Sequence, residues 1–311
     1  MHMPPQLHQN PILAGQVLER LNPAGWPLPP GAFPQGTALV GGAVRDALLN
    51  RLGPRPDLDL VVSVDAIGFA KEASRRWGGT CVVLDADHGI ARLVIQGWTL
   101  DLATQEGGSL EADLGRRDFT VNAIAYDPFT DTLIDPHGGA TDLQARVLRH
   151  TSAAFGEDPL RVLRAMQFAA RFDFSLAPET ATLSRQIADT FWELPVERVW
   201  GEWDKWATKA SKPSQGLIVL KQAGWLHHFP EIAALDGVPQ EPEWHPEGDV
   251  FIHTGHCLDA LVGLATWRNG TPHTRRILSL SVLGHDFGKA LTTKQAERRG
   301  KLRWTSPETG E

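Results

Sequence analysis

Two aspartates separated by one residue are the strongest candidates for chemistry in this chain. Asp57 and Asp59 stand at the start of the apolar run Leu58–Val62, which is typical of a β-strand. Side chains at i and i+2 of a strand point to the same face, so the two carboxylates converge. Close carboxylates repel each other unless a divalent cation lies between them. The pair predicts a Mg²⁺ site for phosphoryl or nucleotidyl transfer, although a surface strand with an acidic edge also fits the pattern.

A glycine pair upstream of the aspartates could bind phosphate. The apolar run Thr37–Val40 is followed by Gly41-Gly42 and then by a helical pattern over 43–49. This order brings backbone N–H groups and the positive end of a helix towards a phosphate. Arg45 in the first turn would add a charged donor. A Gly-Gly turn alone is more often an ordinary strand-to-helix corner, but the aspartates that follow favour phosphate chemistry.

Three further segments complete a pattern that is found in a known family. They are Arg116–Ala123 (RRDFTVNA), Asp135–Arg149 (DPHGGATDLQARVLR) and Gly156–Arg164 (GEDPLRVLR). With the glycine pair and the aspartates, they occur in the order typical of the class II tRNA nucleotidyltransferases, the CCA-adding and CC-adding enzymes, and of the related bacterial poly(A) polymerases. The chain resembles this family over roughly residues 37–290, and the family belongs to the DNA polymerase beta superfamily.

The resemblance implies which residues bind a nucleoside triphosphate. Asp57 and Asp59 would be catalytic and would hold two Mg²⁺ ions. Asp118 and Asn122 would hold the ribose and its 2′-hydroxyl, although from the residues alone Asp118 fits a helix N-cap equally well. The residues that would contact the phosphates are Gly42, Arg45, Arg117 and Arg164.

The segment around Asp158 implies how the base is chosen. Asp158, Arg161 and Arg164 lie at steps of three residues and form one polar stripe on the expected helix. Asp158 also suits an N-cap, and Pro159 suits the first helical position. In the family, this element is a protein template, in which Asp158 and Arg161 would select the base. A carboxylate accepts from the exocyclic amine of cytosine or adenine, and arginine donates to ring acceptors.

Three other sites have supporting roles by resemblance. Family members usually have Arg at the position of Gln167, so no nucleotide contact is assigned there. Glu197-Arg198 resembles a motif that braces the template helix. Asp135–Arg149 resembles the element that joins the catalytic sheet to the helical part, and its Pro and Gly residues indicate a tight turn.

The length of one loop favours CC addition. Eleven residues separate Thr104 from Arg116, whereas CCA-adding members carry a longer loop that helps to switch from CTP to ATP. We therefore expect addition of CC from CTP to the 3′ end of the tRNA acceptor stem, with a separate enzyme adding A. Full CCA addition from CTP and ATP is the alternative, followed by a poly(A) polymerase, an HD-type phosphohydrolase or a non-catalytic RNA-binding protein. Asp101 is either a third active-site carboxylate or an ordinary strand residue.

Residues near the end of the chain carry a second resemblance. His253 and His285-Asp286 resemble ligands of an HD domain, a helical metal-dependent phosphohydrolase module, and form a candidate residual metal site. Such a site normally needs further His and Asp ligands downstream, and none follows Asp286 in the sequence. We expect a truncated, partial HD-like domain without phosphohydrolase activity.

Composition limits the class of protein. Of 311 residues, 42% are hydrophobic and 22% charged, enough apolar residues for a sizeable core. The sequence has no stretch of 18 apolar residues and no leader pattern, so we expect a cytoplasmic protein without membrane contact. The net charge is −7, but residues 268–303 hold nine Lys and Arg against two acidic residues. This stretch is either a local phosphate-binding surface or a solvated basic face.

The order of strand and helix patterns predicts an α+β fold. Strand candidates alternate with helices up to residue 150, whereas helical periodicity dominates after Pro159, where the expected helices include 160–172, 178–191 and 255–267. We expect an N-terminal helix and loop over 1–36 and a polymerase-beta-like nucleotidyltransferase head with a small mixed sheet over 37–150. An all-α neck and body should follow over 151–229, and the HD-like part over 230–311, with Pro230–Pro246 as a linker.

Overall fold

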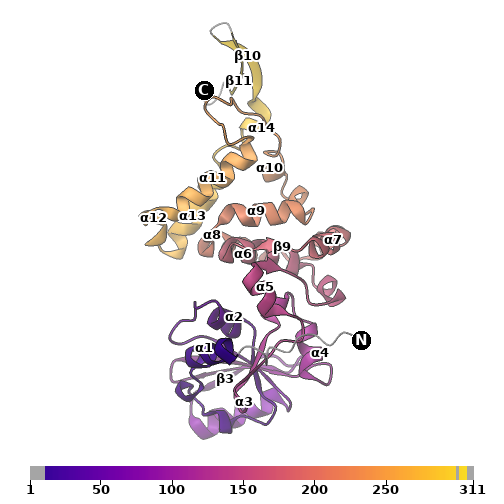
Figure 1. Ribbon diagram of the computed structural model, residues 1–311, viewed down its shortest axis with the longest axis vertical. Helices are drawn as coiled ribbons and strands as arrows, with labels where there is room; N and C mark the ends of the chain where they lie inside the picture. Colours follow the sequence, from indigo (N-terminus) through magenta and orange to yellow (C-terminus); the bar gives the residue numbers. More distant parts are fainter. Residues whose placement is uncertain (1–10, 299–300, 307–311) are drawn as a thin grey trace. The chain divides into compact units, whose positions relative to one another are not determined.

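The computed structural model describes residues 11–298 and 301–306, which form two compact units (Figure 1). The first unit extends to Ala145 and includes Arg149–Phe155, and the second consists of Arg146–Leu148 and the residues from Gly156 onward. The first unit therefore combines the N-terminal helix with the predicted head. The second combines the predicted neck and body with the HD-like part. Residues 1–10 of the expected N-terminal part and residues 299–300 of the basic stretch lie outside the described residues.

A mixed sheet forms the centre of the first unit. Within the described residues its strand order is β3-β4-β5-β2-β1-β6-β7. Strands β2 and β5 are parallel, and the other neighbours are antiparallel. The strands are β1 (Ala38–Val40), β2 (Leu58–Val62), β3 (Thr80–Asp85), β4 (Ile90–Ile95), β5 (Trp98–Thr104), β6 (Ala125–Asp127) and β7 (Thr132–Ile134). The α+β class with a small mixed sheet is thus confirmed, whereas β6 and β7 were not predicted.

The described part of the first unit also contains five α-helices, and a short 3-10 helix carries Asn122 of the candidate site. They are α1 (Pro11–Leu21), α2 (Gly42–Leu48), α3 (Ala66–Trp77), α4 (Leu110–Gly115), α5 (Gly139–Ala145) and the 3-10 helix η4 (Thr120–Asn122). Helix α3 begins where the Asp65 carboxylate accepts a hydrogen bond from the Ile67 N–H. A buried apolar cluster between β1, β2, β6 and α4 then fixes the strands that carry the site, and it consists of Ala38, Val40, Val61, Leu114, Ala123 and Ala125.

The second unit is mainly helical (Figure 1). Helix α6 packs on α8 and α9, α11 packs on α9 and α13, and α13 packs on α8. The helices are α6 (Leu160–Phe172), α7 (Pro178–Gln186), α8 (Val196–Lys209), α9 (Pro213–Gln222), α10 (Pro230–Ala233), α11 (Val250–Gly263), α12 (Ala265–Arg268), α13 (Pro272–Gly284) and α14 (Lys289–Thr292). The unit also contains two pairs of strands, β8 (Val147–Leu148) with β9 (Ser175–Leu176) and β10 (Lys294–Arg298) with β11 (Lys301–Thr305).

Three expectations about this unit were wrong in detail. The helix expected over 178–191 ends at Gln186 and continues as a 3-10 helix over Ala188–Glu193. The helix expected over 255–267 begins at Val250, because the Asp249 carboxylate caps it, and breaks at Leu264, whose backbone is extended. The expected linker 230–246 contains α10 and lies within one compact unit.

The basic stretch near the end of the chain is engaged in internal contacts. Arg275 donates to the Trp267 carbonyl at 3.0 Å and stacks on its ring, and Arg276 pairs with Asp204 at 2.6 Å. Arg303 pairs with Glu243 at 2.6 Å. These three of the nine basic side chains are thus held by internal contacts, which neither a phosphate-binding surface nor a solvated basic face predicts. No helix within the described residues has the length and apolar character needed to cross a membrane.

Candidate active site

The carboxylates of the first unit gather around Asp59 on β2. The sheet register places Asp59 beside Val40 of β1 and beside Asp101 of β5, so Asp59 and Asp101 lie on the same face. Burial, together with the negative charges of Asp101 and Asp57, raises the pKa of Asp59 to about 6, although Arg117 and Arg45 oppose the shift. The exposed Asp57 is therefore close enough to repel Asp59. This repulsion is the condition under which a bound divalent cation is most favourable.

Asp101 has a cationic partner of its own. Its two carboxylate oxygens accept hydrogen bonds from Arg92 Nε and Nη2, each at 2.7 Å. Arg92 lies opposite Asp101 on β4. Such a two-pronged contact orients the carboxylate and partly neutralises it. Asp101 therefore contributes negative charge next to Asp59 while its own oxygens are held by Arg92.

The glycine turn comes close to this carboxylate group. Gly41 has φ +72°, a conformation that favours glycine, and directly precedes α2. A Cβ atom at Gly41 would lie 3.5 Å from Asp59 Oδ2 and 3.5 Å from Arg117 Nη1. It would also lie 4.0 Å from the Asn122 carbonyl oxygen. Three motifs that are far apart in the sequence thus meet at one turn, whose positive φ favours glycine.

Arg45 and the ribose candidates form a buried network. Arg45 is 5% exposed, and its Nη1 donates to Asn122 Oδ1 at 2.6 Å while its Nε donates to Asp46 Oδ1 at 2.8 Å. Asn122 Nδ2 donates to Asp118 Oδ1 at 2.9 Å, and the Phe119 N–H donates to the same oxygen at 2.7 Å. The structure thus brings Arg45, Asn122 and Asp118 together.

Arg117 has an unused donor in this environment. Its Nη2 pairs with Asp113 Oδ2 of α4 at 3.2 Å. Its Nε is buried and has no hydrogen-bond partner among the described residues. A buried guanidinium donor without an acceptor is costly, and an anionic oxygen would satisfy it. Arg117 therefore fits a phosphate ligand.

The template residues lie at the start of α6 in the second unit. Helix α6 begins at Leu160, and Pro159 rather than Asp158 occupies the N-cap position. Asp158 Oδ1 accepts from the Leu160 N–H at 3.2 Å, and its Oδ2 pairs with Arg198 Nη2 at 2.8 Å. Arg198 therefore holds the carboxylate that the resemblance assigns to base selection.

The remaining α6 positions differ in exposure. Arg161 and Arg164 are half-buried, and the Arg164 guanidinium lies 5.2 Å from the centre of the Phe168 ring. Gln167 is 3% exposed, and its Oε1 has no partner among the described residues.

The HD-like residues also come together. His285 Nε2 lies 3.3 Å and His253 Nε2 lies 3.9 Å from Asp286 Oδ2. Two residues without a recognised motif join them, since Glu247 Oε1 lies 2.6 Å from His253 Nδ1 and Cys257 Sγ lies 3.4 Å from His253 Nε2. Cys257 could have been found from its i+4 spacing on the same helix face as His253, whereas Glu247 precedes the helix and carries no such signal.

Comparisons with known proteins agree with this geometry. The family described as "Poly A polymerase head domain" matches residues 37–149. A "Multifunctional CCA protein" of Mannheimia succiniciproducens is 41% identical over 278 residues, which cover 83% of this chain and 64% of that relative. Over residues 37–149 the chain thus matches this head domain, and over most of its length it is similar to proteins of the class II tRNA nucleotidyltransferase family.

Solved structures of CCA-adding enzymes have a similar fold. A CCA-adding enzyme in complex with CTP has a TM-score of 0.65 at 26% identity, covering 91% of this chain and 67% of that one. The Thermotoga maritima CCA-adding enzyme in complex with tRNA has a TM-score of 0.62 at 25% identity, covering 96% and 71%. The chain spans about 64% of the length of the curated relatives that it matches.

Proposed function

We propose that the chain is a template-independent nucleotidyltransferase that builds CCA on the 3′ end of tRNA from CTP and ATP. The observation that carries this proposal is the convergence of Gly41, Asp59 and Arg117 at one turn, with a buried donor suited to phosphate. The names of the relatives support CCA addition rather than the CC addition expected from the loop. Because tRNA is the proposed substrate, we place the activity in the cytoplasm.

The residues of the first unit would bind the triphosphate. Asp57 and Asp59 would hold two Mg²⁺ ions, which when bound increase the acidity of a hydroxyl and stabilise phosphate charge. The Arg117 guanidinium and the Gly42 turn would contact phosphate oxygens. The ribose would contact Asp118 and Asn122, and Arg45 would act by holding Asn122 in place.

Asp158, just before α6, and two arginines of α6 would contact the base and the phosphates. Asp158, held by Arg198, would accept from the exocyclic amine of cytosine or adenine, and Arg161 would donate to ring acceptors. Arg164 would contact the phosphates. In the reaction, the 3′-oxygen of tRNA loses its proton and bonds to the α-phosphorus of the nucleotide, and the bond to the bridging oxygen breaks, which releases pyrophosphate.

CC addition remains the second candidate because of one structural observation. The segment between Thr104 and Arg116 forms the short helix α4 and no extended loop. If loop length decides ATP use, the enzyme would stop after two cytidines and would depend on a separate A-adding enzyme. A poly(A) polymerase would instead add long tails of adenosine to generic RNA.

Primer extension on a tRNA that ends at the discriminator base tests the proposal. With Mg²⁺, CTP alone should add two residues, and CTP with ATP should add three. A stop after two residues in the presence of ATP would support CC addition, and ATP-only tails would support the polymerase. Asp57→Ala should abolish transfer while tRNA binding persists. No incorporation by the wild-type chain would overturn the proposal.

A further inference from the structure

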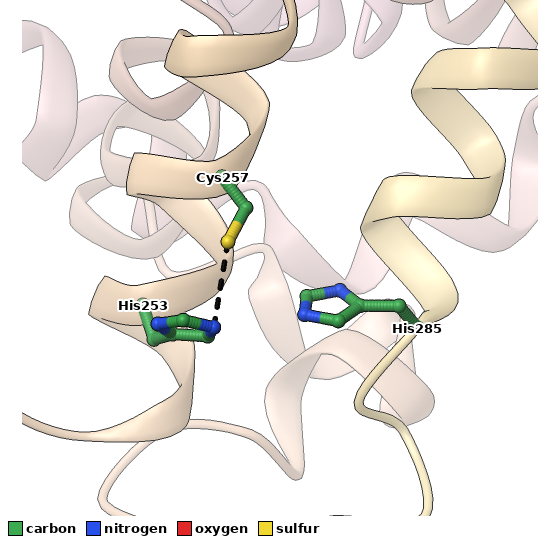
Figure 2. A group of neighbouring side chains, drawn as sticks. All are labelled: His253, Cys257 and His285. Atoms are coloured by element: carbon green, nitrogen blue, oxygen red, sulfur yellow. Dashed lines mark hydrogen bonds between the residues drawn. The ribbon is translucent and has the colours of Figure 1, made fainter. Parts of the chain in front are cut away.

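The second unit contains a cluster of metal-binding side chains. His253 and Cys257 lie on α11, and His285 directly follows α13 and turns its ring towards them (Figure 2). One ligand atom from each of these residues lies within 4.8 Å of the others. The resemblance to HD domains covers His253, His285 and Asp286, but it gives no role to the thiol.

We propose that Cys257 is a metal ligand and that it makes this site a zinc site. Zn²⁺ would be bound by His253 Nε2, Cys257 Sγ and His285 Nε2, and Asp286 Oδ2 would take the fourth position.

The distances between the ligand atoms fit a tetrahedral ion. Zn–N, Zn–O and Zn–S bonds of about 2.0–2.3 Å at tetrahedral angles place ligand atoms about 3.3–3.8 Å apart. His253 Nε2 lies 3.4 Å from Cys257 Sγ, and His285 Nε2 lies 3.3 Å from Asp286 Oδ2. His253 Nε2 and Asp286 Oδ2 are 3.9 Å apart, slightly beyond that range. Small side-chain movements would complete the coordination.

Hydrogen bonds at Nδ1 orient both histidines so that Nε2 is the metal-binding nitrogen. His253 Nδ1 lies 2.6 Å from Glu247 Oε1, and His285 Nδ1 lies 2.6 Å from the Val282 carbonyl oxygen. Both acceptors require a proton on Nδ1, which leaves the Nε2 lone pair directed at the cluster. Carboxylates and carbonyls commonly orient zinc-bound histidines in this way. Glu247 is therefore a positioning residue for the metal.

The charges around the cluster suit a divalent ion bound to a thiolate. Lys289 Nζ lies 3.2 Å from Asp286 Oδ2, and His245 Nδ1 lies 3.1 Å from Glu247 Oε1. With neutral histidines, the negative charges of Asp286, Glu247 and a Cys257 thiolate equal the positive charges of Lys289 and Zn²⁺. A neutral thiol would leave an excess positive charge beside the metal.

The ligand types distinguish this site from the carboxylate site. Thiolate and imidazole ligands favour Zn²⁺, whereas Mg²⁺ takes oxygen ligands. The Mg²⁺ required for nucleotide transfer would therefore not displace zinc from the cluster. Zinc binding and nucleotide transfer can be measured independently of each other.

Metal analysis of variants tests the role of the thiol. The wild-type chain, loaded with Zn²⁺ and dialysed, should retain one zinc ion per chain. Cys257→Ser should bind zinc at least about tenfold more weakly, and Glu247→Ala about 10–100-fold more weakly. Cys81→Ser, at the other cysteine on β3, should bind zinc like the wild type. Unchanged zinc affinity in Cys257→Ser, or no zinc in the wild type, would overturn the proposal.

Cobalt substitution tests thiolate coordination in the wild-type chain itself, without relying on a variant. Co²⁺ bound to a thiolate gives a near-ultraviolet charge-transfer band, which should appear in the wild-type chain and in Cys81→Ser. The band should be absent from Cys257→Ser whose thermal unfolding in EDTA matches that of the wild type. A wild-type Co²⁺ complex without this band would show that Cys257 is not a ligand.

Discussion

Arg45 Nη1 donates a 2.6 Å hydrogen bond to Asn122 Oδ1 and so links α2 to the 3-10 helix η4, 77 positions further along the chain. The two side chains are 5% and 6% exposed. A buried guanidinium requires such an acceptor, because an unpaired buried charge is costly.

Replacing Asn122 with Ala should therefore lower both stability and activity. We expect the free energy of unfolding to fall by about 1–3 kcal/mol, because Arg45 and Asp118 each lose a partner. The KM for CTP should also rise. Urea unfolding and steady-state kinetics measure the two effects, with Asn269→Ala, at an exposed position, as the control. An Asn122→Ala variant with wild-type stability would contradict the role of this network.

Asp59→Asn should stabilise the metal-free protein while it abolishes transfer. Because the pKa of Asp59 is raised to about 6 in the folded state, the folded protein binds this proton more tightly than the unfolded chain. The stability that the bound proton on Asp59 contributes is present at low pH and is lost as the pH rises through about 6. Above that pH, we expect a neutral amide in place of the carboxylate to raise the free energy of unfolding by about 1–3 kcal/mol.

Urea unfolding in EDTA on both sides of about pH 6 checks this expectation. The difference between Asp59→Asn and the wild type should grow as the pH rises. Asp87→Asn, at an exposed position in the turn between β3 and β4, is the matched control. A difference in the free energy of unfolding that does not change with pH would mean that the Asp59 carboxylate is not destabilised by its neighbours.

Arg198→Ala should weaken base selection without abolishing transfer. Arg198 holds Asp158 Oδ2 at 2.8 Å, but both side chains are partly exposed, at 48% and 33%. Such a pair is worth about 1 kcal/mol or less, so discrimination of CTP against UTP should fall by no more than about fivefold. Competition assays measure this ratio, with Arg268→Ala as the control. Full discrimination in Arg198→Ala would show that Asp158 needs no such support.

Gln167→Leu should stabilise the protein and leave CTP incorporation unchanged. The Gln167 Oε1 atom is buried without a partner among the described residues, and an apolar side chain would remove that cost. We expect the free energy of unfolding to rise by about 1 kcal/mol. Gln144→Leu, at an exposed position, should have little effect. Reduced incorporation by Gln167→Leu would instead indicate a contact with the nucleotide.

Local patterns predicted the central elements of the fold but not the short ones. The apolar run 58–62 became β2, which is paired on both sides and buried. Strands β6 and β7 have three residues each, too few for an alternation pattern; β6 depends on pairing with β1, and β7 on pairing with β6. The break at Leu264 was missed because apolar residues continue through it.

The candidate site was predictable where residues are close in sequence or belong to a motif. Asp57 directly precedes β2 and Asp59 lies on it, so the two carboxylates are close because only one residue separates them. The pairing of Arg92 with Asp101 depends on the register of β4 and β5, which no local pattern specifies. Glu247 meets His253 because of the chain path before α11, which likewise depends on the tertiary fold.

The contact between Asp113 and Arg117 restricts where evolution or a designer could lengthen the chain. Asp113 lies within α4, four residues before Arg117, so an insertion between these two residues would move the carboxylate away from the arginine. Gly107 and Gly108, both with positive φ, lie in the turn before Ser109 caps α4. A longer loop grafted at these two glycines would leave α4 intact and would test how a specificity element is gained or lost without rebuilding the catalytic sheet.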